Sequence, residues 1–195
     1  MAGLLRSALV SFASLTVLTG IAYPVVVGAL AESLFPFQAH GSLIRDGEQV
    51  LGSTWIGQPF TGPGFFWSRP SATRTVAYDA AASSGSNLGP SNPLLYESVA
   101  ARMAELRAAH ASLGPVPVDL VTTSASGLDP HISPAAAEYQ LARVARVRGL
   151  PEESIRRLVA VHTEGRTLGL LGEPRVSVLS LNLDLERLDQ RAAGE

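Results

Sequence analysis

The stretch SALVSFASLTVLTGIAYPVVVGALA, from Ser7 to Ala31, decides how this chain is organised, because none of its residues carries a charge. As an α-helix rising about 1.5 Å per residue, it would extend roughly 37 Å, which is enough to cross a hydrocarbon core of about 30 Å with some tilt. No other part of the sequence is apolar for so long. The sequence therefore predicts one N-terminal transmembrane helix followed by one soluble domain.

Two interpretations of this stretch compete. Ala29-Leu30-Ala31 before Glu32 offers a small-x-small cleavage pattern, which would make the stretch a secretory signal and the remainder a secreted binding domain. Its length favours a retained helix, since the apolar region of a signal usually runs about 7–15 residues. Gly20 and Gly28 would let a neighbouring membrane helix approach closely, and we expect that face to pack against another subunit.

The charges that flank the apolar stretch predict its orientation. Arg6 precedes it, whereas Glu32 follows it and the next basic residue is Arg45. By the positive-inside rule, Met1 lies in the cytoplasm and the body of the chain lies outside the cell (inner) membrane, in a single-pass arrangement. The predicted organisation is thus an anchor over residues 1–34 and an extracytoplasmic soluble domain over residues 35–195.

Composition excludes several function classes. With 17 acidic and 15 basic residues, the formal net charge is −2, so there is no basic field for nucleic acid. All the basic residues are Arg, and the absence of Lys rules out a Walker-type phosphate loop and a Schiff-base enzyme. Once the anchor is set aside, the remainder is long enough for one domain with its own core.

The predicted elements of the soluble domain indicate an α+β fold. Apolar periodicity predicts three helices, and Gly149 and Gly165 mark the ends of the second and third. Runs rich in Val and Leu predict three strands. We expect a small sheet covered on one side by helices, with helices over 94–110, 134–148 and 151–164, strands within 41–50 and over 118–122 and 176–181, and a short closing helix or tail from Asn182.

The segment from Gly52 to Pro93 has few charges but contains both Trp residues and three of the six Phe residues. Aromatic residues argue against disorder, and long ordered loops in compact domains are often binding loops. We therefore predict that residues 55–71 and 83–93 face a partner protein. The residues predicted to make that interface are Trp55, Phe60, Phe66, Trp67, Arg69, Asn87 and Asn92.

No catalytic or metal-binding constellation is convincing. Ser126 and His131 suggest a membrane-tethered extracytoplasmic hydrolase as an alternative, but there is no G-x-S-x-G elbow. We favour a helix-entry loop in which Ser124, Ser126 and Asp129 accept hydrogen bonds from backbone N–H groups. No two His residues have H-x-x-x-H spacing. The sequence therefore favours an accessory subunit over an enzyme, and we predict neither catalytic residues nor a metal site.

Four runs closely resemble the C subunit of the bacterial potassium-transporting P-type ATPase, the KdpC family. They follow one another in order and cover nearly the whole chain, together with the N-terminal anchor. The runs are GSTWIGQPFTGPGFFWSRPSAT (Gly52–Thr73), SSGSNLGPSNP (Ser83–Pro93), VPVDLVTTSASGLDPHISPAAAEYQLARVA (Val116–Ala145) and PRVSVLSLNLDLE (Pro174–Glu186).

The resemblance implies a single-span subunit of a high-affinity, ATP-driven potassium uptake complex. Its partners would be a potassium-translocating subunit and an ATP-hydrolysing subunit, and its role that of a catalytic chaperone that raises the ATP affinity of the latter. ATP binding is attributed to the family. The residues that match its proposed nucleotide site are Ser124, Ser126, Gly127, Asp129 and Gln140.

The predicted orientation constrains how ATP could act. ATP is cytoplasmic, whereas Arg6 and Glu32 place Gln140 outside the membrane. We therefore expect the soluble domain to lie over the ion entrance of the translocating subunit and to aid assembly or ion access. An effect on ATP affinity would then be coupling between distant sites, transmitted through the membrane.

Overall fold

The computed structural model describes residues 2–110 and 114–193. The chain divides into two compact units, Met1–Ser53 and Thr54–Glu195. The sequence placed a boundary after residue 34, where the apolar helix does end, but the hairpin that follows groups with the helix. The second unit begins at Thr54.

The first unit is dominated by one long apolar helix made of α1 (Ala2–Val17), the π-helical turn η1 (Leu18–Ala22) and α2 (Tyr23–Leu34). By length and composition this helix could cross a membrane, and none of its residues is buried within the chain. The wide turn lies just before Pro24, and the Tyr23 N–H donates to the Leu18 carbonyl. Proline has no N–H to donate to the helix's hydrogen bonds, and the wider turn accommodates this gap in the backbone hydrogen bonding.

After α2, the first unit ends in a short helix and a hairpin. The helix α3 (Pro36–Ala39) precedes β1 (Leu43–Asp46) and β2 (Gln49–Ser53), which pair antiparallel. The sequence predicted a strand between residues 41 and 50, and the structure confirms it as the first arm of this hairpin.

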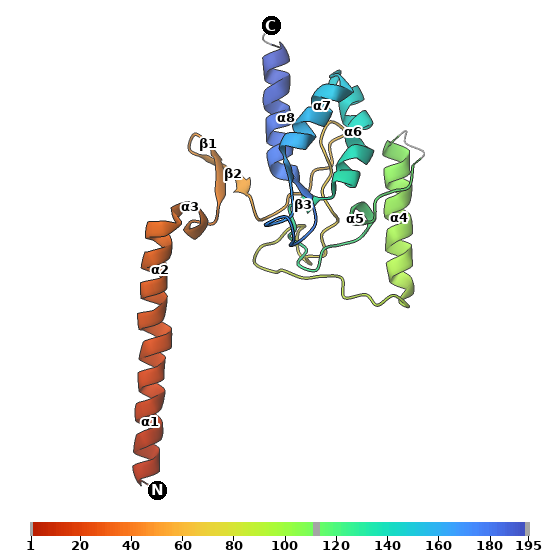
Figure 1. Cartoon of the computed structure of the whole chain (residues 1–195). Helices are drawn as coiled ribbons and strands as arrows, with labels where there is room; N and C mark the ends of the chain where they lie inside the picture. The colour runs from red at the N-terminus through yellow and green to blue at the C-terminus, as the bar shows by residue number, and fades with distance from the viewer. Residues whose placement is uncertain (1, 111–113, 194–195) are drawn as a thin grey trace. The chain divides into compact units, whose positions relative to one another are not determined.

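The second unit packs helices around a very small sheet (Figure 1). Its elements are α4 (Pro93–Ala109), α5 (Val118–Val121), β3 (His131–Ile132), α6 (Pro134–Arg148), α7 (Glu152–Val161), β4 (Thr163–Glu164), β5 (Arg175–Ser177) and α8 (Val178–Ala193). The antiparallel sheet has the order β3-β5-β4. Helices α6, α7 and α8 pack side by side, and α4 lies beside α5. This confirms the predicted α+β class.

Local side-chain and backbone chemistry sets the ends of the helices. The Ser133 hydroxyl accepts a hydrogen bond from the Ala136 N–H at 3.0 Å and caps α6. The Asn92 side chain caps α4 in the same way through the Leu94 N–H, also at 3.0 Å. Gly149 ends α6 with a φ of 67°, a left-handed conformation that glycine adopts without strain.

One predicted strand is wrong and another is correct only at its start, and both errors come from short apolar runs. Residues 118–122 form the helical turn α5, which follows Pro117 and buries Leu120 and Val121. Of the last predicted strand, over residues 176–181, only Val176 and Ser177 lie in β5. From Val178 the chain is helical, because Val178, Leu181 and Leu185 bury together at helical spacing. Asn182 consequently lies within α8 instead of beginning it.

The third predicted helix is shorter than expected. Helix α7 ends at Val161, and Thr163–Glu164 then pairs with β5 as strand β4. The core of the second unit is built from the inward faces of its helices together with β3 and β5. Its largest fully buried side chain is Phe66, which belongs to the segment between β2 and α4.

Candidate functional site

The segment from Thr54 to Asn92 contains no helix or strand, yet its middle is held in the core of the second unit. Two side-chain amides hold it. Asn182 of α8 accepts from the Phe66 N–H at 2.9 Å and donates to the Phe66 carbonyl at 2.9 Å. Gln140 of α6 accepts from the Trp67 N–H at 2.7 Å and donates to the Trp67 carbonyl at 3.1 Å. The two amides satisfy backbone groups that a neighbouring strand would otherwise satisfy.

Gln140 is wholly engaged within the chain. Its side chain is 0% exposed, and its carbonyl oxygen also accepts a hydrogen bond from Arg143 at 3.0 Å. Both ends of the amide therefore have partners in the folded protein. A ligand could reach this amide only by displacing the Trp67 backbone, at the cost of unpaired buried polar groups.

Arg143 is the second buried anchor of the segment. Its guanidinium donates to the carbonyls of Pro63 and Phe65, the latter at 2.9 Å, and lies 4.5 Å from the centre of the Trp67 ring. Its Nε donates to His110 Nε2 at 2.9 Å. Burial lowers the pKa of Arg143 to about 10, so the group stays charged at neutral pH.

His110 connects this anchor to the end of α4. Its Nδ1 contacts the Leu106 carbonyl at 2.7 Å, and because Nε2 accepts from Arg143, the proton of the neutral ring lies on Nδ1. Burial lowers the pKa of His110, and the nearby Arg143 and Arg146 cations lower it further, whereas the hydrogen bond to Leu106 opposes the shift. The neutral imidazole is therefore the form that fits the fold.

Arg148, at the end of α6, holds the first part of the same segment. Its Nε donates to the Gly64 carbonyl at 2.5 Å, and its guanidinium lies 4.8 Å from the centre of the Phe65 ring. It also pairs with Asp189 of α8. Residues 63–67 are thus fixed by polar side chains that α6 and α8 direct inward.

The loop before β3 satisfies its own backbone, as expected for a helix-entry loop. The Ser124 hydroxyl accepts from the Gly127 N–H at 2.9 Å, and the Ser126 hydroxyl accepts from the Leu128 N–H at 3.1 Å. Asp129 accepts from the His131 N–H at 3.0 Å and pairs with Arg69 at 2.9 Å. Burial opposes the charge of Asp129, but the hydrogen bonds from His131 and the Arg69 cation outweigh it and lower the pKa of this carboxyl.

Gly127 serves a close approach between two loops. Its φ is +69°, and a Cβ there would lie 2.5 Å from the Ser84 carbonyl oxygen. The Ser84 N–H donates to the Ser126 carbonyl at 2.9 Å, which ties the loop around Ser84 to the one around Ser126. The glycine therefore has a packing function within the chain.

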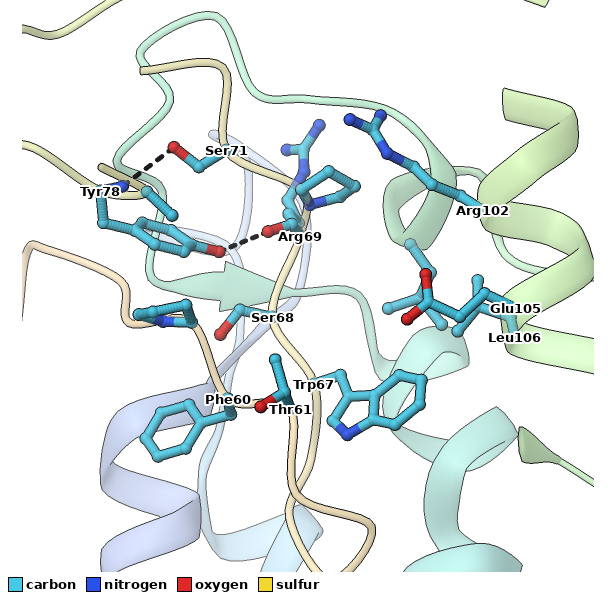
Figure 2. Close-up of a pocket in the computed structure, with 14 residues that line it drawn as sticks. Phe60, Thr61, Trp67, Ser68, Arg69, Ser71, Tyr78, Arg102, Glu105 and Leu106 are labelled. Carbon is cyan, nitrogen blue, oxygen red and sulfur yellow. Dashed lines mark hydrogen bonds between the residues drawn. The ribbon is translucent and has the colours of Figure 1, made fainter. Parts of the chain in front are cut away.

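A cavity of about 270 Å³ opens beside the anchored segment (Figure 2). Phe60 and Trp67 line it, together with Arg69 and Arg102. Arg102 donates to the Val121 carbonyl at 3.1 Å, and burial lowers its pKa. In Figure 2 the two rings lie toward one end of the view, and the two guanidinium groups lie toward the other.

Tyr78 closes one wall of this cavity. Its hydroxyl donates to the Arg69 carbonyl, and its N–H donates to the Ser71 hydroxyl at 3.0 Å (Figure 2). Burial raises the pKa of Tyr78 to about 12. The phenol therefore stays protonated and keeps donating at every physiological pH.

The structure gives the predicted interface residues different roles. Phe60, Trp67 and Arg69 meet at the cavity, whereas Phe66 is 0% exposed and belongs to the core, so its side chain is not available to a partner. The residues with exposed or capping positions are Trp55, which is 59% exposed, Asn87, which is exposed with a φ of 52°, and Asn92, which caps α4.

The hydrolase arrangement does not form. His131 contacts Asp129 at 3.2 Å, but within residues 2–110 and 114–193 no hydrogen bond joins it to Ser126. His131 lines a separate cavity of about 290 Å³ with Trp55 and His162, and Ser126 is not among that cavity's residues. In the described part of the chain, no group of three or more His, Cys, Asp or Glu side chains could hold a metal ion.

Sequence reasoning missed the residues that anchor the segment. Asn182, Arg143, Arg148 and His110 are polar, and the apolar periodicity used to place the helices ignores them. A signal was present, since Arg143 lies on the same helix as the inward-facing Leu141 and Val144. A polar residue next to an apolar stripe can mark a buried hydrogen-bond anchor.

Comparison with known proteins places this architecture in a family. The family model described as K+-transporting ATPase, c chain (KdpC), matches residues 5–187. A KdpC subunit of a potassium-transporting ATPase from Sorangium cellulosum (strain So ce56) is 62% identical over 183 residues, which cover 93% of this chain and 96% of that protein. The KdpC subunit from Polaromonas naphthalenivorans (strain CJ2) is 63% identical over 190 residues, 96% of each chain. The KdpC subunit from Burkholderia mallei (strain SAVP1) is 56% identical over 187 residues, 95% of this chain and 97% of that protein.

The family match over residues 5–187 covers most of the apolar helix and most of the second unit. The apolar helix and the transporter family together indicate a membrane-anchored protein. The chain belongs to the KdpC family of K+-transporting ATPase c chains.

Proposed function

We propose that this chain is the non-catalytic, accessory subunit of a high-affinity, ATP-driven potassium uptake complex. The observation that carries this proposal is the family match over residues 5–187, which leaves little of the chain outside it. The relatives are named potassium-transporting ATPase KdpC subunits. The partners would be a potassium-translocating subunit and an ATP-hydrolysing subunit.

The proposed arrangement is a single pass through the cell (inner) membrane, with the N-terminus in the cytoplasm. The apolar helix over residues 2–34 supports the span, and Arg6 before it and Glu32 near its other end support the orientation. The second unit then lies outside. Its low-charge segment and the cavity lined by Phe60 and Trp67 suit a surface that covers the ion entrance of the translocating subunit.

The proposed chaperone effect on ATP affinity is indirect. Gln140 is buried with both ends of its amide hydrogen-bonded, and the Ser124 and Ser126 hydroxyls accept from backbone N–H groups. These contacts support structural roles for residues that the family resemblance links to nucleotide. Raised ATP affinity would then arise because the chain stabilises the conformation of the complex that binds ATP.

The test measures KM for ATP in purified complexes that carry Ser126→Ala in this chain. Ser126 is exposed, so the fold tolerates its loss, and Ser98→Ala in α4 is the matched control. We expect both variants to keep the wild-type KM. A several-fold higher KM for Ser126→Ala alone, with the chain present in full amount and its thermal unfolding unchanged, would contradict the indirect mechanism.

A further inference from the structure

Residues Arg166–Glu173, here called the leucine loop, display three leucines to solvent. Leu168, Leu170 and Leu171 are 87%, 80% and 64% exposed. Single exposed leucines are ordinary on protein surfaces, but three at the tip of one loop form a contiguous apolar patch. The core of the second unit does not use them.

The leucine loop is closed by hydrogen bonds of its own backbone. Thr167 and Leu171 exchange two backbone hydrogen bonds, at 2.9 Å and 3.0 Å, and close the loop. Leu168 has a φ of 55°, a left-handed conformation that costs energy for a residue with a side chain. The fold thus holds a strained backbone that presents leucine at its tip, which is the kind of preorganisation that benefits binding.

The charges around the loop are already paired with one another. Arg166 donates to both oxygens of Glu173 at 2.7 Å and 2.8 Å, and below the loop Arg175 pairs with Glu164 at 2.7 Å. Residues 163–175 contain no aromatic residue, and their two basic residues, Arg166 and Arg175, are the ones already paired with Glu173 and Glu164. Loops that insert into lipid surfaces usually carry basic and aromatic residues, so this loop is better suited to an uncharged protein surface.

We propose that the leucine loop docks into an uncharged, apolar socket on another protein subunit of the potassium-transporting ATPase complex. This rests on the proposed function, which supplies that subunit. The leucines would supply the buried apolar contacts, and the Arg166–Glu173 pair would stay at the rim without needing a charged partner.

The first test weakens the loop's contacts without disturbing its shape. Leu168→Asn keeps a residue type that tolerates positive φ, and Leu170→Ser removes a second apolar side chain. We expect the double variant to be released from the affinity-purified complex at least roughly tenfold faster than wild type, since each buried leucine side chain is worth about that factor. Val118→Ser is the control, because Val118 is 70% exposed but lies elsewhere. Unchanged release of the double variant would contradict the proposal.

The second test identifies what covers the loop. The chain has no Cys, so Leu170→Cys provides a single thiol whose alkylation by a maleimide can be followed by the mass of this chain. We expect at least tenfold slower alkylation in the assembled complex than in the chain alone in lipid vesicles. A thiol that stays reactive in the complex would overturn the proposal, as would one already protected in vesicles, where only lipid or a second copy could cover it. Absence of this chain from the purified complex would instead overturn the proposed function.

Discussion

The helix over residues 2–34 and the segment over residues 54–92 are both rich in large apolar side chains, but they find their partners in opposite ways. Every described residue of the helix is exposed or half-buried, so its apolar surface must be covered from outside the chain. The segment instead buries Phe66 completely and is held by Asn182, Gln140 and Arg143. The helix forms its own backbone hydrogen bonds, but nothing in the described part of the chain covers its apolar side chains. The segment depends on other elements of the second unit both for its backbone hydrogen bonds and for the burial of its apolar side chains.

This difference shows which side chains determine the conformation of the segment in the second unit. A helix closes its own hydrogen bonds, so a lipid environment suffices for the anchor. The segment has no strand partner, and inward-facing polar side chains take the place of a neighbouring strand. We therefore expect that replacing a single buried polar residue will lower the stability of the second unit. Substitutions in the anchor should leave this chain's own fold intact.

The largest effect is expected from Arg143→Ala. This change leaves the carbonyls of Pro63 and Phe65 and the His110 Nε2 atom without their donor. The free energy of unfolding should fall by about 3–5 kcal/mol, as is typical when a buried, fully bonded charged group is removed. Thermal unfolding of the full chain in detergent, followed by near-ultraviolet circular dichroism, measures this. Arg157→Ala, an exposed residue with one surface ion pair, should change stability by less than about 1 kcal/mol.

A smaller loss is expected from Gln140→Leu. The substitution fills similar space but leaves the Trp67 N–H and carbonyl unpaired, which should cost about 2–3 kcal/mol. The same unfolding measurement applies, and Gln49→Leu in the exposed hairpin is the control. Wild-type stability for Gln140→Leu would show that the amide does not anchor the segment.

The pH dependence of stability should report His110. Its folded pKa lies below its unfolded value of about 6.5, so its contribution is fully present above that pH and is lost as the pH falls through the folded pKa. Protonation would also put a second cation beside Arg143. We expect the melting temperature to fall between pH 7 and pH 5, and His110→Gln to flatten that fall. An equally steep fall in His110→Gln would assign the pH dependence to other groups.

The smallest effect on this chain's own fold is expected from Gly20→Leu in the anchor. A Cβ at Gly20 meets no atom of the chain within 4 Å, so helix content and unfolding of the second unit should not change. If this face packs against another subunit, the bulky side chain should reduce the amount of chain that co-purifies with the complex. Normal co-purification would show that the Gly20 face is turned to lipid.

The sequence predicts the long elements of this fold well, because their periodicity and their caps agree. Helices α4 and α6 begin and end close to the predicted residues, and Gly149 ends α6 as expected. The errors fall where an apolar run is too short for its period to distinguish helix from strand, as at residues 118–122 and 176–181. Such runs take the structure that the surrounding core imposes.

The candidate site was predictable only in part. The sequence identified the aromatic segment as ordered, and Phe60, Trp67 and Arg69 do meet at one cavity. It could not show that Phe66 is core or that Asn182 pairs with it, because these residues are 116 positions apart and their contact depends on the whole topology. Long-range hydrogen bonds of this kind leave no local pattern.

The indirect effect on ATP depends most on which side of the membrane the second unit occupies, since a unit outside the cell cannot meet cytoplasmic ATP. The most direct measurement places a single thiol on the exposed face of α4 with Ala104→Cys, and exposes intact cells to a membrane-impermeant maleimide. The matched control is Gly3→Cys, near the end predicted to be cytoplasmic. With the second unit outside, we expect rapid labelling at position 104 and labelling at position 3 only after lysis. Protection at position 104 until lysis would contradict the proposed topology and would place the loop from Ser124 to Asp129 on the same side of the membrane as ATP.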